Sequence, residues 1–364
     1  MKKFLQSTAL IVEAVLIYLA IWPVDIKPVA WNAPIDQGYV GDFAPNQDLA
    51  DLNLIDIGDI HGPEDVASQI IDGRLYLFVS SQDGLIRKID AQTQTVETLA
   101  DTGGVPLGFE FDGAGNLILA DAFKGLLSIA PDGEVTTLTN EADGLPILYA
   151  DDLDIAPDGV IYFSDASTKF GAEWAGETMK GSLYEIMEHS RNGRVLAYDP
   201  STSETTTVMT GLSFSNGIAM GPDGESILVI ETGEYRIHRY WVSGPQKGES
   251  EIIIDNLPGF PDNINRAPDG NYYVGLVSKR SAFLDKNSAK PFWRKVAWRL
   301  PEFMRPKAVN YGMVIHMTAD GKVLQTWQDP SGAYPATTGA HAPGDGWLYI
   351  SSLTADKLGR KKLD

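Results

Sequence analysis

The stretch Leu257–Gly270 reads LPGFPDNINRAPDG and combines a turn with a candidate cation-binding pair. Its second half, APDG at 267–270, is a typical turn sequence, and NYYV at 271–274 after it predicts a β-strand. Its first half places Asp262 and Asn263 at the head of an apolar strand. Two oxygen-bearing side chains pack poorly there, but carboxylate and amide oxygens are good ligands for a hard cation.

The turn motif recurs at a spacing that predicts the fold. Strand-opening turns end at Gly73, Gly115, Gly159, Gly224, Gly270 and Gly346, so the steps between them are 42, 44, 65, 46 and 76 residues. Repeats of about 40 to 50 residues made of short strands are typical of propeller blades. The two long steps contain insertions, at about 169–192 and 279–310. The sequence therefore predicts an all-β fold, a six-bladed β-propeller with a helical cap insertion.

Equivalent positions in the six blades follow from counting back from these glycines. Eight residues before five of them stand Leu107, Asp151, Asn216, Asp262 and Thr338, and nine before Gly73 stands Glu64. Equivalent residues of propeller blades lie at the same height around the central channel, so we expect Glu64, Asp151, Asn216 and Asp262 to form one ring.

Three carboxylates in a narrow channel repel strongly, and a bound Ca²⁺ with its 6 to 8 oxygen ligands would resolve this. The ring is therefore a predicted metal site, with Ca²⁺ expected and Zn²⁺ or Mn²⁺ as other possibilities. The simpler interpretation is that such side chains only cap strand ends, and this is what we expect for Asp65 and Asp152.

Composition limits the classes of partner. The 364 residues carry 49 acidic and 29 basic side chains, a net charge of −20, and no cysteine. Binding to phosphate backbones needs a basic patch, so we expect no nucleic-acid partner. Disulfides, thiolate metal sites and cysteine nucleophiles are excluded.

The N-terminal segment 1–24 predicts a membrane anchor or a signal sequence. Met1-Lys2-Lys3 precedes the apolar run ALIVEAVLIYLAIWPV at 9–24, whose length is at the low end of the 17 to 25 residues of a membrane span. No clear small-residue cleavage site follows, so an uncleaved anchor that leaves the rest outside the cytoplasm is preferred over secretion. Residues 25–50 predict a linker and residues 51–364 the propeller.

The second insertion is the one basic and aromatic region. Lys286, Lys290, Arg294, Lys295 and Arg299 alternate there with Phe, Trp and Leu residues. We expect a helical cap over the channel or a membrane-facing patch, and an ordinary solvated helix fits the pattern equally well.

Several phrases resemble one superfamily, that of strictosidine synthase, the senescence-marker/gluconolactonase proteins and the paraoxonases. They are GPEDVA at 62–67, DDLDIAPDGVIYFSDASTKF at 151–170, SFSNGIAMGPDG at 213–224, RIHRYWVSGPQKG at 236–248 and PGFPDNI at 258–264. The resemblance covers nearly the whole chain after about residue 50 and is strongest to the adipocyte plasma membrane-associated group. It implies a six-bladed propeller with a divalent cation, usually calcium, in the channel.

The resemblance also implies roles for single residues. Glu64, Asn216 and Asp262 match the family's metal ligands, Asp151 stands where the family usually has Asn, and Asn263 follows Asp262 as in paraoxonase-like members. Asp262 is the expected general base, as in gluconolactonase-like relatives. Two catalytic residues of relatives are missing, since Leu107 replaces a His of the paraoxonases and the TTGA sequence at 337–340 lacks the Glu of strictosidine synthase.

Three functions follow as hypotheses. The first is a calcium-dependent hydrolase of lactones or aryl esters, in which the cation polarises the carbonyl, Asp262 acts as base and His61 reaches the rim of the site. The second is a non-catalytic, membrane-tethered binding propeller, favoured by Leu107. The third, a condensing enzyme for amines and aldehydes, is disfavoured because the sixth-blade carboxylate is missing.

Overall fold

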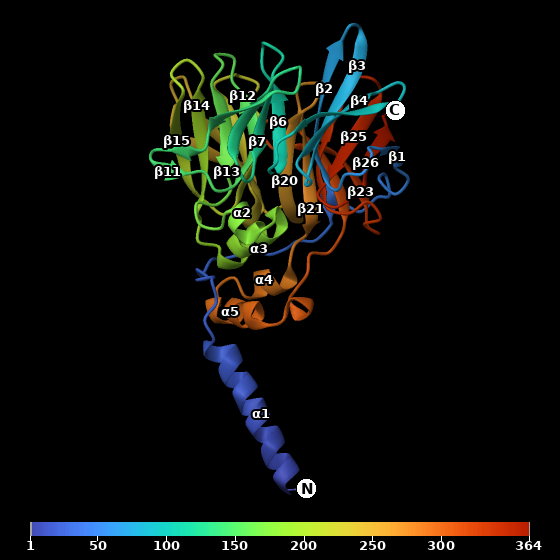
Figure 1. The fold of residues 1–364 in the computed structure, drawn as a ribbon. Helices are drawn as coiled ribbons and strands as arrows, with labels where there is room; N and C mark the ends of the chain where they lie inside the picture. Colours follow the sequence, from blue (N-terminus) through green and yellow to red (C-terminus); the bar gives the residue numbers. More distant parts are fainter. Residues whose placement is uncertain (1, 364) are drawn as a thin grey trace.

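The computed structural model describes residues 2–363 and is a six-bladed β-propeller that stands on an N-terminal helix (Figure 1). Each blade is one four-stranded antiparallel sheet, as predicted. Met1 and Asp364, the outer ends of the predicted anchor and propeller, lie outside the described residues.

The first three blades follow one another along the chain. Blade one contains β2 (Pro63–Ile71), β3 (Arg74–Ser81), β4 (Leu85–Asp90) and β5 (Val96–Asp101). Blade two contains β6 (Pro106–Phe111), β7 (Leu117–Asp121), β8 (Gly125–Ile129) and β9 (Val135–Thr139). A short hairpin of β10 (Glu141–Ala142) and β11 (Leu145–Pro146) leads to blade three. Blade three contains β12 (Ala150–Ile155), β13 (Ile161–Asp165), β14 (Gly193–Asp199) and β15 (Glu204–Leu212).

The last three blades include the strand that closes the circle. Blade four contains β16 (Ser215–Met220), β17 (Ser226–Glu231), β18 (Arg236–Trp241) and β19 (Ser250–Ile254). Blade five contains β20 (Gly259–Arg266), β21 (Tyr272–Lys279), β22 (Gly312–Met317) and β23 (Val323–Asp329). Blade six contains β24 (Thr337–His341), β25 (Trp347–Ser352), β26 (Lys357–Lys362) and, from the other end of the chain, β1 (Asn53–Asp56). β1 pairs antiparallel with β26, so both ends of the propeller segment share one sheet and close the circle.

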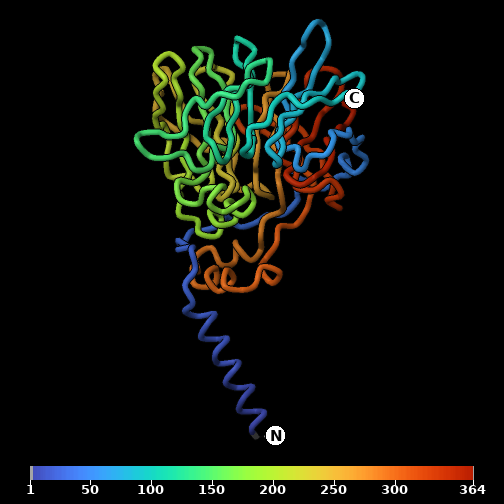
Figure 2. The backbone as a smooth tube through the Cα atoms, in the orientation of Figure 1, coloured from blue at the N-terminus to red at the C-terminus, as the bar shows by residue number. Residues whose placement is uncertain are grey.

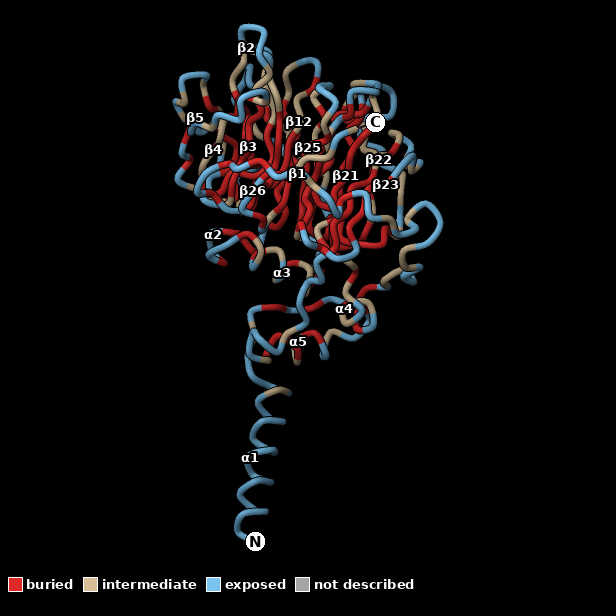
Figure 3. Tube along the Cα trace, turned by 90° about the vertical axis from the view of Figure 1, so that its right-hand side faces the viewer, coloured by how far each residue is buried: buried red, intermediate tan, exposed pale blue. Residues whose placement is uncertain are grey.

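The first strand of every blade lies innermost. β2, β6, β12, β16, β20 and β24 contact one another in a closed circle around the channel. The middle strands are buried on both faces, for example β7 and β17, and Figure 3 shows the buried residues concentrated in the strands of the propeller. Apolar clusters fill the spaces between blades. Apolar residues on both faces of a sheet are what packing against a neighbouring blade on each side requires.

The turns of blades three to six adopt one local structure because of two residue types. In the turn before β21, Asp269 accepts a hydrogen bond from the backbone N–H of Asn271 at 3.0 Å, and Gly270 has a φ of +82°. Such an Asx turn followed by a left-handed residue suits Asp and Gly. Blade one differs, because Asp72 and Gly73 both have positive φ and form a two-residue hairpin turn.

The helices lie at one end of the propeller. They are α1 (Lys2–Ile21), α2 (Ala172–Ala175), α3 (Thr178–Glu188), α4 (Ala282–Lys286) and α5 (Pro291–Arg299), with 3₁₀ turns η1 (Gly41–Phe43), η2 (Thr232–Glu234) and η3 (Glu302–Met304). α2 and α3 form the first insertion, after β13, and α4, α5 and η3 form the second, after β21. Figures 1 and 3 show both insertions between the propeller and α1, so the predicted cap insertion is helical.

The segment 25–50, expected as a linker, is pinned against the molecule. Figure 2 shows it running between the propeller and the second insertion toward β1. Val29 donates its N–H to the carbonyl of Glu188 and Trp31 to that of Ser288, and the side chain of Ile26 is fully buried. The segment therefore fastens the helical end of the molecule to the blades.

Candidate functional site

Each innermost strand carries a β-bulge at the ring position identified in the sequence. The pairing register between first and second strands shifts within residues 63–66, 106–109, 150–153, 215–218, 261–264 and 337–340. A bulge interrupts the alternation of side chains between the two faces of a strand. A ring residue and its successor can therefore both reach the channel, as Asp262 and Asn263 do.

In each bulge the ring residue and its successor form a pair, and the type of pair alternates from blade to blade around the propeller. Blades one, three and five carry Glu64-Asp65, Asp151-Asp152 and Asp262-Asn263, whereas blades two, four and six carry Leu107-Gly108, Asn216-Gly217 and Thr338-Gly339. A Cβ on Gly108 would lie 2.0 Å from Oδ1 of Asp152, and one on Gly217 would lie 2.7 Å from the carbonyl oxygen of Asp262. Glycine in the even blades thus leaves room for the polar pairs of the odd blades.

The predicted ring residues are buried together at one mouth of the channel. Asn216 donates from Nδ2 to Oδ1 of Asp262 at 2.5 Å, and Asn263 donates from Nδ2 to Oε1 of Glu64 at 2.9 Å. Thr338, the ring residue of blade six, donates from Oγ1 to the backbone carbonyl of Glu64 at 2.6 Å. Glu64, Asn216, Asp151 and Asp262 are only 1, 2, 4 and 6 % exposed.

Four oxygens of this ring are buried without a hydrogen-bond donor among the described residues. They are Oε2 of Glu64, Oδ1 of Asn216, Oδ2 of Asp262 and Oδ1 of Asn263. An unpaired buried acceptor is costly, and these four belong to residues that are hydrogen-bonded in two pairs, Asn216 with Asp262 and Asn263 with Glu64, so a positive ligand would satisfy them. Oxygen donors without sulfur or imidazole are the ligand type of a hard divalent cation, so the residues fit calcium.

The ring is not built from acidic residues alone. Within residues 2–363 no point is approached by three or more His, Cys, Asp or Glu side chains closely enough to hold a metal ion. The three ring carboxylates therefore do not form a metal-binding group by themselves, and the amide oxygens of Asn216 and Asn263 are further oxygen atoms that the ring offers.

The three ring carboxyl groups influence one another electrostatically. Burial raises the pKa of Asp262 to about 7, although the hydrogen bond from Asn216 opposes the shift. Burial and then the charge of Asp262 raise the pKa of both Glu64 and Asp151 well above the ordinary range. A cation in place of these protons would favour the ionised form of all three carboxyl groups, because its positive charge would offset both their burial and their mutual repulsion.

Asp65 and Asp152 do more than cap strand ends. Asp65 accepts the backbone N–H of Phe109 in blade two at 3.3 Å, and Asp152 accepts that of Ile218 in blade four at 2.9 Å. Each carboxylate therefore fastens its blade to the next one. Their pKa values are raised by burial.

The first insertion covers the mouth of the channel. Thr178, at the start of α3, donates to Oε1 of Gln82 in blade one at 2.6 Å, whereas the other end of α3 lies on blade four. Beneath it, Tyr149 donates its hydroxyl to the carbonyl of Thr178 at 3.0 Å and packs edge-on against Phe214. Burial and the charges of Asp151, Asp262 and Glu64 all raise the pKa of Tyr149. The side chain of Tyr149 therefore lies near these carboxylates.

Leu107 belongs to the apolar wall of the same mouth. It packs in a cluster that also contains Tyr149, Ala172 and Phe214. The paraoxonase-type histidine is therefore replaced by a side chain that contributes only apolar surface here.

The predicted catalytic residue His61 lies at the outer rim. Its Nδ1 is 3.0 Å from Oδ1 of Asp356, and half of its side chain is exposed. The structure thus pairs His61 with a surface carboxylate rather than with the ring. A second histidine, His341, is partly buried, with Nε2 2.8 Å from the hydroxyl of Ser68, and desolvation lowers its pKa to about 4.

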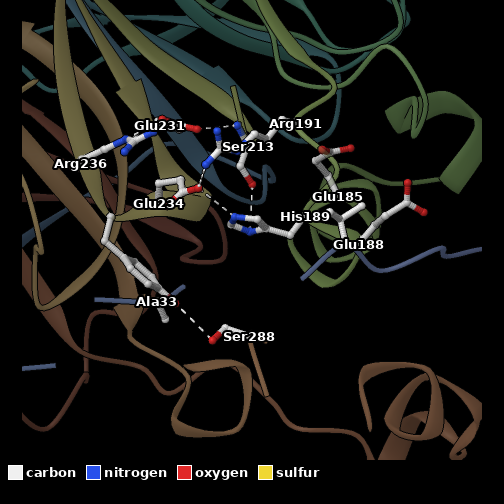
Figure 4. A network of polar contacts seen from close by, with 12 residues as sticks. Ala33, Glu185, Glu188, His189, Arg191, Ser213, Glu231, Glu234, Arg236 and Ser288 are labelled. Atoms are coloured by element: carbon white, nitrogen blue, oxygen red, sulfur yellow. Dashed lines mark hydrogen bonds and ion pairs between the residues drawn. The ribbon is translucent and has the colours of Figure 1, made fainter. Parts of the chain in front are cut away.

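A buried polar network joins α3 to blade four (Figure 4). His189, which directly follows the last residue of α3, lies 3.1 Å from both the hydroxyl of Ser213 and Oε1 of Glu234. Burial opposes ionisation of Glu234, but its bond to His189 and the nearby arginines lower its pKa to about 2. Ser213 is fully buried, and a Cβ on Gly233 would lie 2.3 Å from its hydroxyl, so a substrate cannot reach this serine unless the chain moves. The arrangement resembles a Ser-His-acid triad, but it anchors α2 and α3, the lid over the mouth of the channel. The spacing of these residues in the sequence gave no sign of the network.

Comparison with known proteins identifies relatives that match most of the chain. The strictosidine synthase family model matches residues 151–245, and the N-terminal model of strictosidine synthase-like proteins matches residues 41–89. The adipocyte plasma membrane-associated protein of Salmo salar is 34 % identical over 343 residues, which cover 87 % of this chain and 79 % of the relative. Protein strictosidine synthase-like 6 of Arabidopsis thaliana is 31 % identical over 311 residues, 84 % of this chain and 80 % of the relative.

Solved structures share the fold at low identity. A gluconolactonase from Xanthomonas campestris superposes with a TM-score of 0.59 at 16 % identity, covering 94 % of this chain and 99 % of that one. The calcium-binding protein regucalcin from Agrobacterium tumefaciens superposes with a TM-score of 0.58 at 13 % identity, covering 85 and 92 %. The sequence matches over most of the chain and the shared propeller lead to one conclusion: the chain belongs to the family of strictosidine synthase-like and adipocyte plasma membrane-associated proteins.

Proposed function

We propose that this protein is a calcium-dependent hydrolase of lactones or aryl esters that acts at the covered mouth of the channel. The observation that carries the proposal is that four buried oxygens of one ring, on Glu64, Asn216, Asp262 and Asn263, have no hydrogen-bond donor among residues 2–363. Asp151 belongs to the proposed ligand set because its ionisation is tied to that of Asp262. The shared fold with a gluconolactonase and with regucalcin agrees with this reading.

A calcium ion held there would polarise the carbonyl of the substrate and favour ionisation of water. Asp262 has one oxygen fixed by Asn216 and one free, so it is placed to accept the proton of the attacking water. Water adds to the carbonyl carbon and the ester C–O bond breaks, which yields a hydroxy acid from a lactone or an acid and a phenol from an aryl ester. His61 has no role in this scheme because it pairs with Asp356 at the rim.

The lid determines access in this scheme. Substrate reaches the buried ring only when α2 and α3 move, and closure then excludes water from the reacting groups. Leu107, Tyr149 and Phe214 would contact the apolar part of the ester.

The experiment is a panel of lactones and aryl esters with the purified full chain, with and without EDTA. We expect hydrolysis of some members, loss with EDTA and recovery with added calcium. Activity that is indifferent to the chelator contradicts the proposal.

A second candidate is a non-catalytic binding propeller. It is favoured by Leu107, which supplies no proton-transfer group where paraoxonase-like relatives have one, and by the closed lid. Calcium binding without hydrolysis of any ester would support it. Amine–aldehyde condensation has no comparable support, since the bulge at 337–340 carries no carboxylate.

We also propose that α1 is an uncleaved anchor that leaves the propeller outside the cytoplasm. Lys3–Ile21 is long and apolar enough to cross a membrane, and none of it is buried against the protein. The name of the plasma membrane-associated relatives agrees with this location. The full chain should resist carbonate extraction from membranes, whereas a mature protein that begins after about residue 24 would reveal a cleaved signal.

A further inference from the structure

The second insertion lies where α1 ends. Arg299, the last residue of α5, donates to the carbonyl of Leu19 at 2.9 Å and to that of Trp22 at 2.6 Å. Tyr18 returns a hydrogen bond to the carbonyl of Arg299 at 3.0 Å. α5 is thus attached to the last turn of the apolar helix, and Figure 3 shows it between α1 and the propeller. If α1 spans a bilayer, α5 lies at the membrane surface.

This insertion exposes large apolar side chains in an otherwise acidic protein. Phe292 and Trp293 on α5 are 50 and 51 % exposed, and Phe303 and Met304 on η3 are 77 and 55 % exposed. The contacts with the rest of the fold come from the other side of α5, where Arg294 is fully buried. It donates to the carbonyls of Met187 and Ser288 at 3.0 and 3.1 Å. The exposed apolar side chains of α5 and η3 are therefore available to contact a membrane or another molecule.

The charge of the insertion is opposite to that of the remaining chain. Residues 279–310 contain nine Lys and Arg against two acidic residues, a net of +7. The remaining 20 basic and 47 acidic residues give −27. Lysines beside exposed aromatic rings are the pattern of a surface that sits among anionic lipid headgroups.

A cleft of about 440 Å³ marks the junction between α1 and α5. Its walls include Tyr18, Trp22, Tyr184, Trp298, Arg299 and Arg305. The guanidinium of Arg305 lies 4.5 Å over the ring of Trp298. Tyrosine, tryptophan and arginine are enriched at the level of lipid headgroups, where one end of the side chain is apolar and the other is solvated.

We propose that α5 and η3, residues 291–304, form a second membrane-contacting surface that lies in the headgroup region of an anionic bilayer beside α1. The inference rests on the anchoring of α1 proposed above. The end of the propeller that carries the ring then faces the bilayer, because α5 and the lid lie at the same end (Figure 1).

The absence of cysteine gives a direct test, because a single cysteine can be labelled. Phe303→Cys carries an environment-sensitive fluorophore in the surface, and Ile70→Cys, 72 % exposed in the β2–β3 hairpin, is the control. The full chain is reconstituted in vesicles with and without phosphatidylglycerol. We expect spin-labelled lipids to quench the label at 303 but not at 70. The substitutions Lys290→Gln and Lys295→Gln should each lower about fivefold the fraction of molecules whose label at 303 is quenched by lipid in anionic vesicles.

Each other outcome overturns the inference. A label at 303 that aqueous iodide quenches as well as the label at 70, while the protein floats with the vesicles, leaves the anchor intact and removes the second surface. Shielding at 303 that requires an added protein instead of lipid assigns the surface to a protein partner. A chain that leaves the vesicles on flotation contradicts both the anchor and the surface.

Discussion

The side-chain amide nitrogen of Asn263 lies 2.9 Å from Oε1 of Glu64, although 199 residues separate them. The contact joins the innermost strands of blades five and one across the mouth of the channel, and Thr338 of blade six also donates to Glu64. The ring is therefore assembled only when blades five and six have come together with blade one. The oxygen atoms that would bind the cation are held in place before it arrives, which lowers the entropic cost of ordering them on binding.

Gly217→Ala tests whether the alternation of bulged pairs shapes the ring. The new methyl group would lie 2.7 Å from the carbonyl oxygen of Asp262 and 2.8 Å from the backbone nitrogen of Ile264. Backbone atoms cannot move aside cheaply, so we expect a loss of about 1 to 3 kcal/mol in the free energy of unfolding and weaker calcium binding. Chemical denaturation and calorimetric titration measure the two effects.

Gly113→Ala is the matched control, because a methyl group there would meet no atom within 4 Å. It should change neither property. Equal behaviour of the two variants would show that the even-blade glycines do not support the site.

Arg294→Met tests how the second insertion is attached. The guanidinium donates to several backbone carbonyls, and burial lowers its pKa only to about 10, so it is a cation at neutral pH. Removing these donors should cost about 2 to 4 kcal/mol. We expect faster proteolysis within residues 279–310, measured by mass spectrometry. Lys295→Met, on the same helix with a half-exposed side chain, should cleave at the wild-type rate; equal cleavage of both variants contradicts the role of Arg294.

The pH dependence of stability has a defined sign. Asp262 has a folded-state pKa of about 7 against an ordinary value of 3.8, so the folded chain holds a proton that the unfolded chain releases. The contribution of this proton to the free energy of unfolding is complete below the ordinary pKa of an aspartate and is lost as pH rises through about 7. In EDTA the melting temperature should therefore fall between about pH 5 and pH 8.

Calcium competes with that proton. The gain in melting temperature on adding calcium should be larger at about pH 8 than at about pH 5, as measured by differential scanning fluorimetry. A gain in melting temperature that is constant across this pH range would show that the cation does not bind at the ring carboxylates.

The propeller was predictable from sequence because its turns are local. Asp269 and Gly270 form their turn with residues two positions apart, so the motif is legible without tertiary information. The ring positions followed because the distance from turn to bulge is the same in five blades. Blade one departs by one residue, since its turn uses Asp72 and Gly73 with positive φ.

The lid and the pinned segment were not predictable, because long-range contacts determine them. His189 is an unremarkable insertion residue until the fold places Ser213 and Glu234 on either side of it. Likewise, residues 25–50 resemble a linker in composition, but Val29 and Trp31 bond to the two insertions. The bonds from Asp65 and Asp152 to neighbouring blades are also invisible in a strand-by-strand reading.

The central claim is that the ring of Glu64, Asp151, Asn216, Asp262 and Asn263 binds calcium. Isothermal titration of calcium into the chelator-treated full chain and its Asp262→Asn variant tests it most directly. The variant keeps an oxygen in place but removes one charge, so the fold should survive and affinity should fall by about tenfold or more, with any esterase activity falling further. Asp269→Asn, a turn residue paired with His316, has the same charge change and should bind like wild type. Unchanged affinity in Asp262→Asn, or no calcium binding by the wild type, would contradict the account.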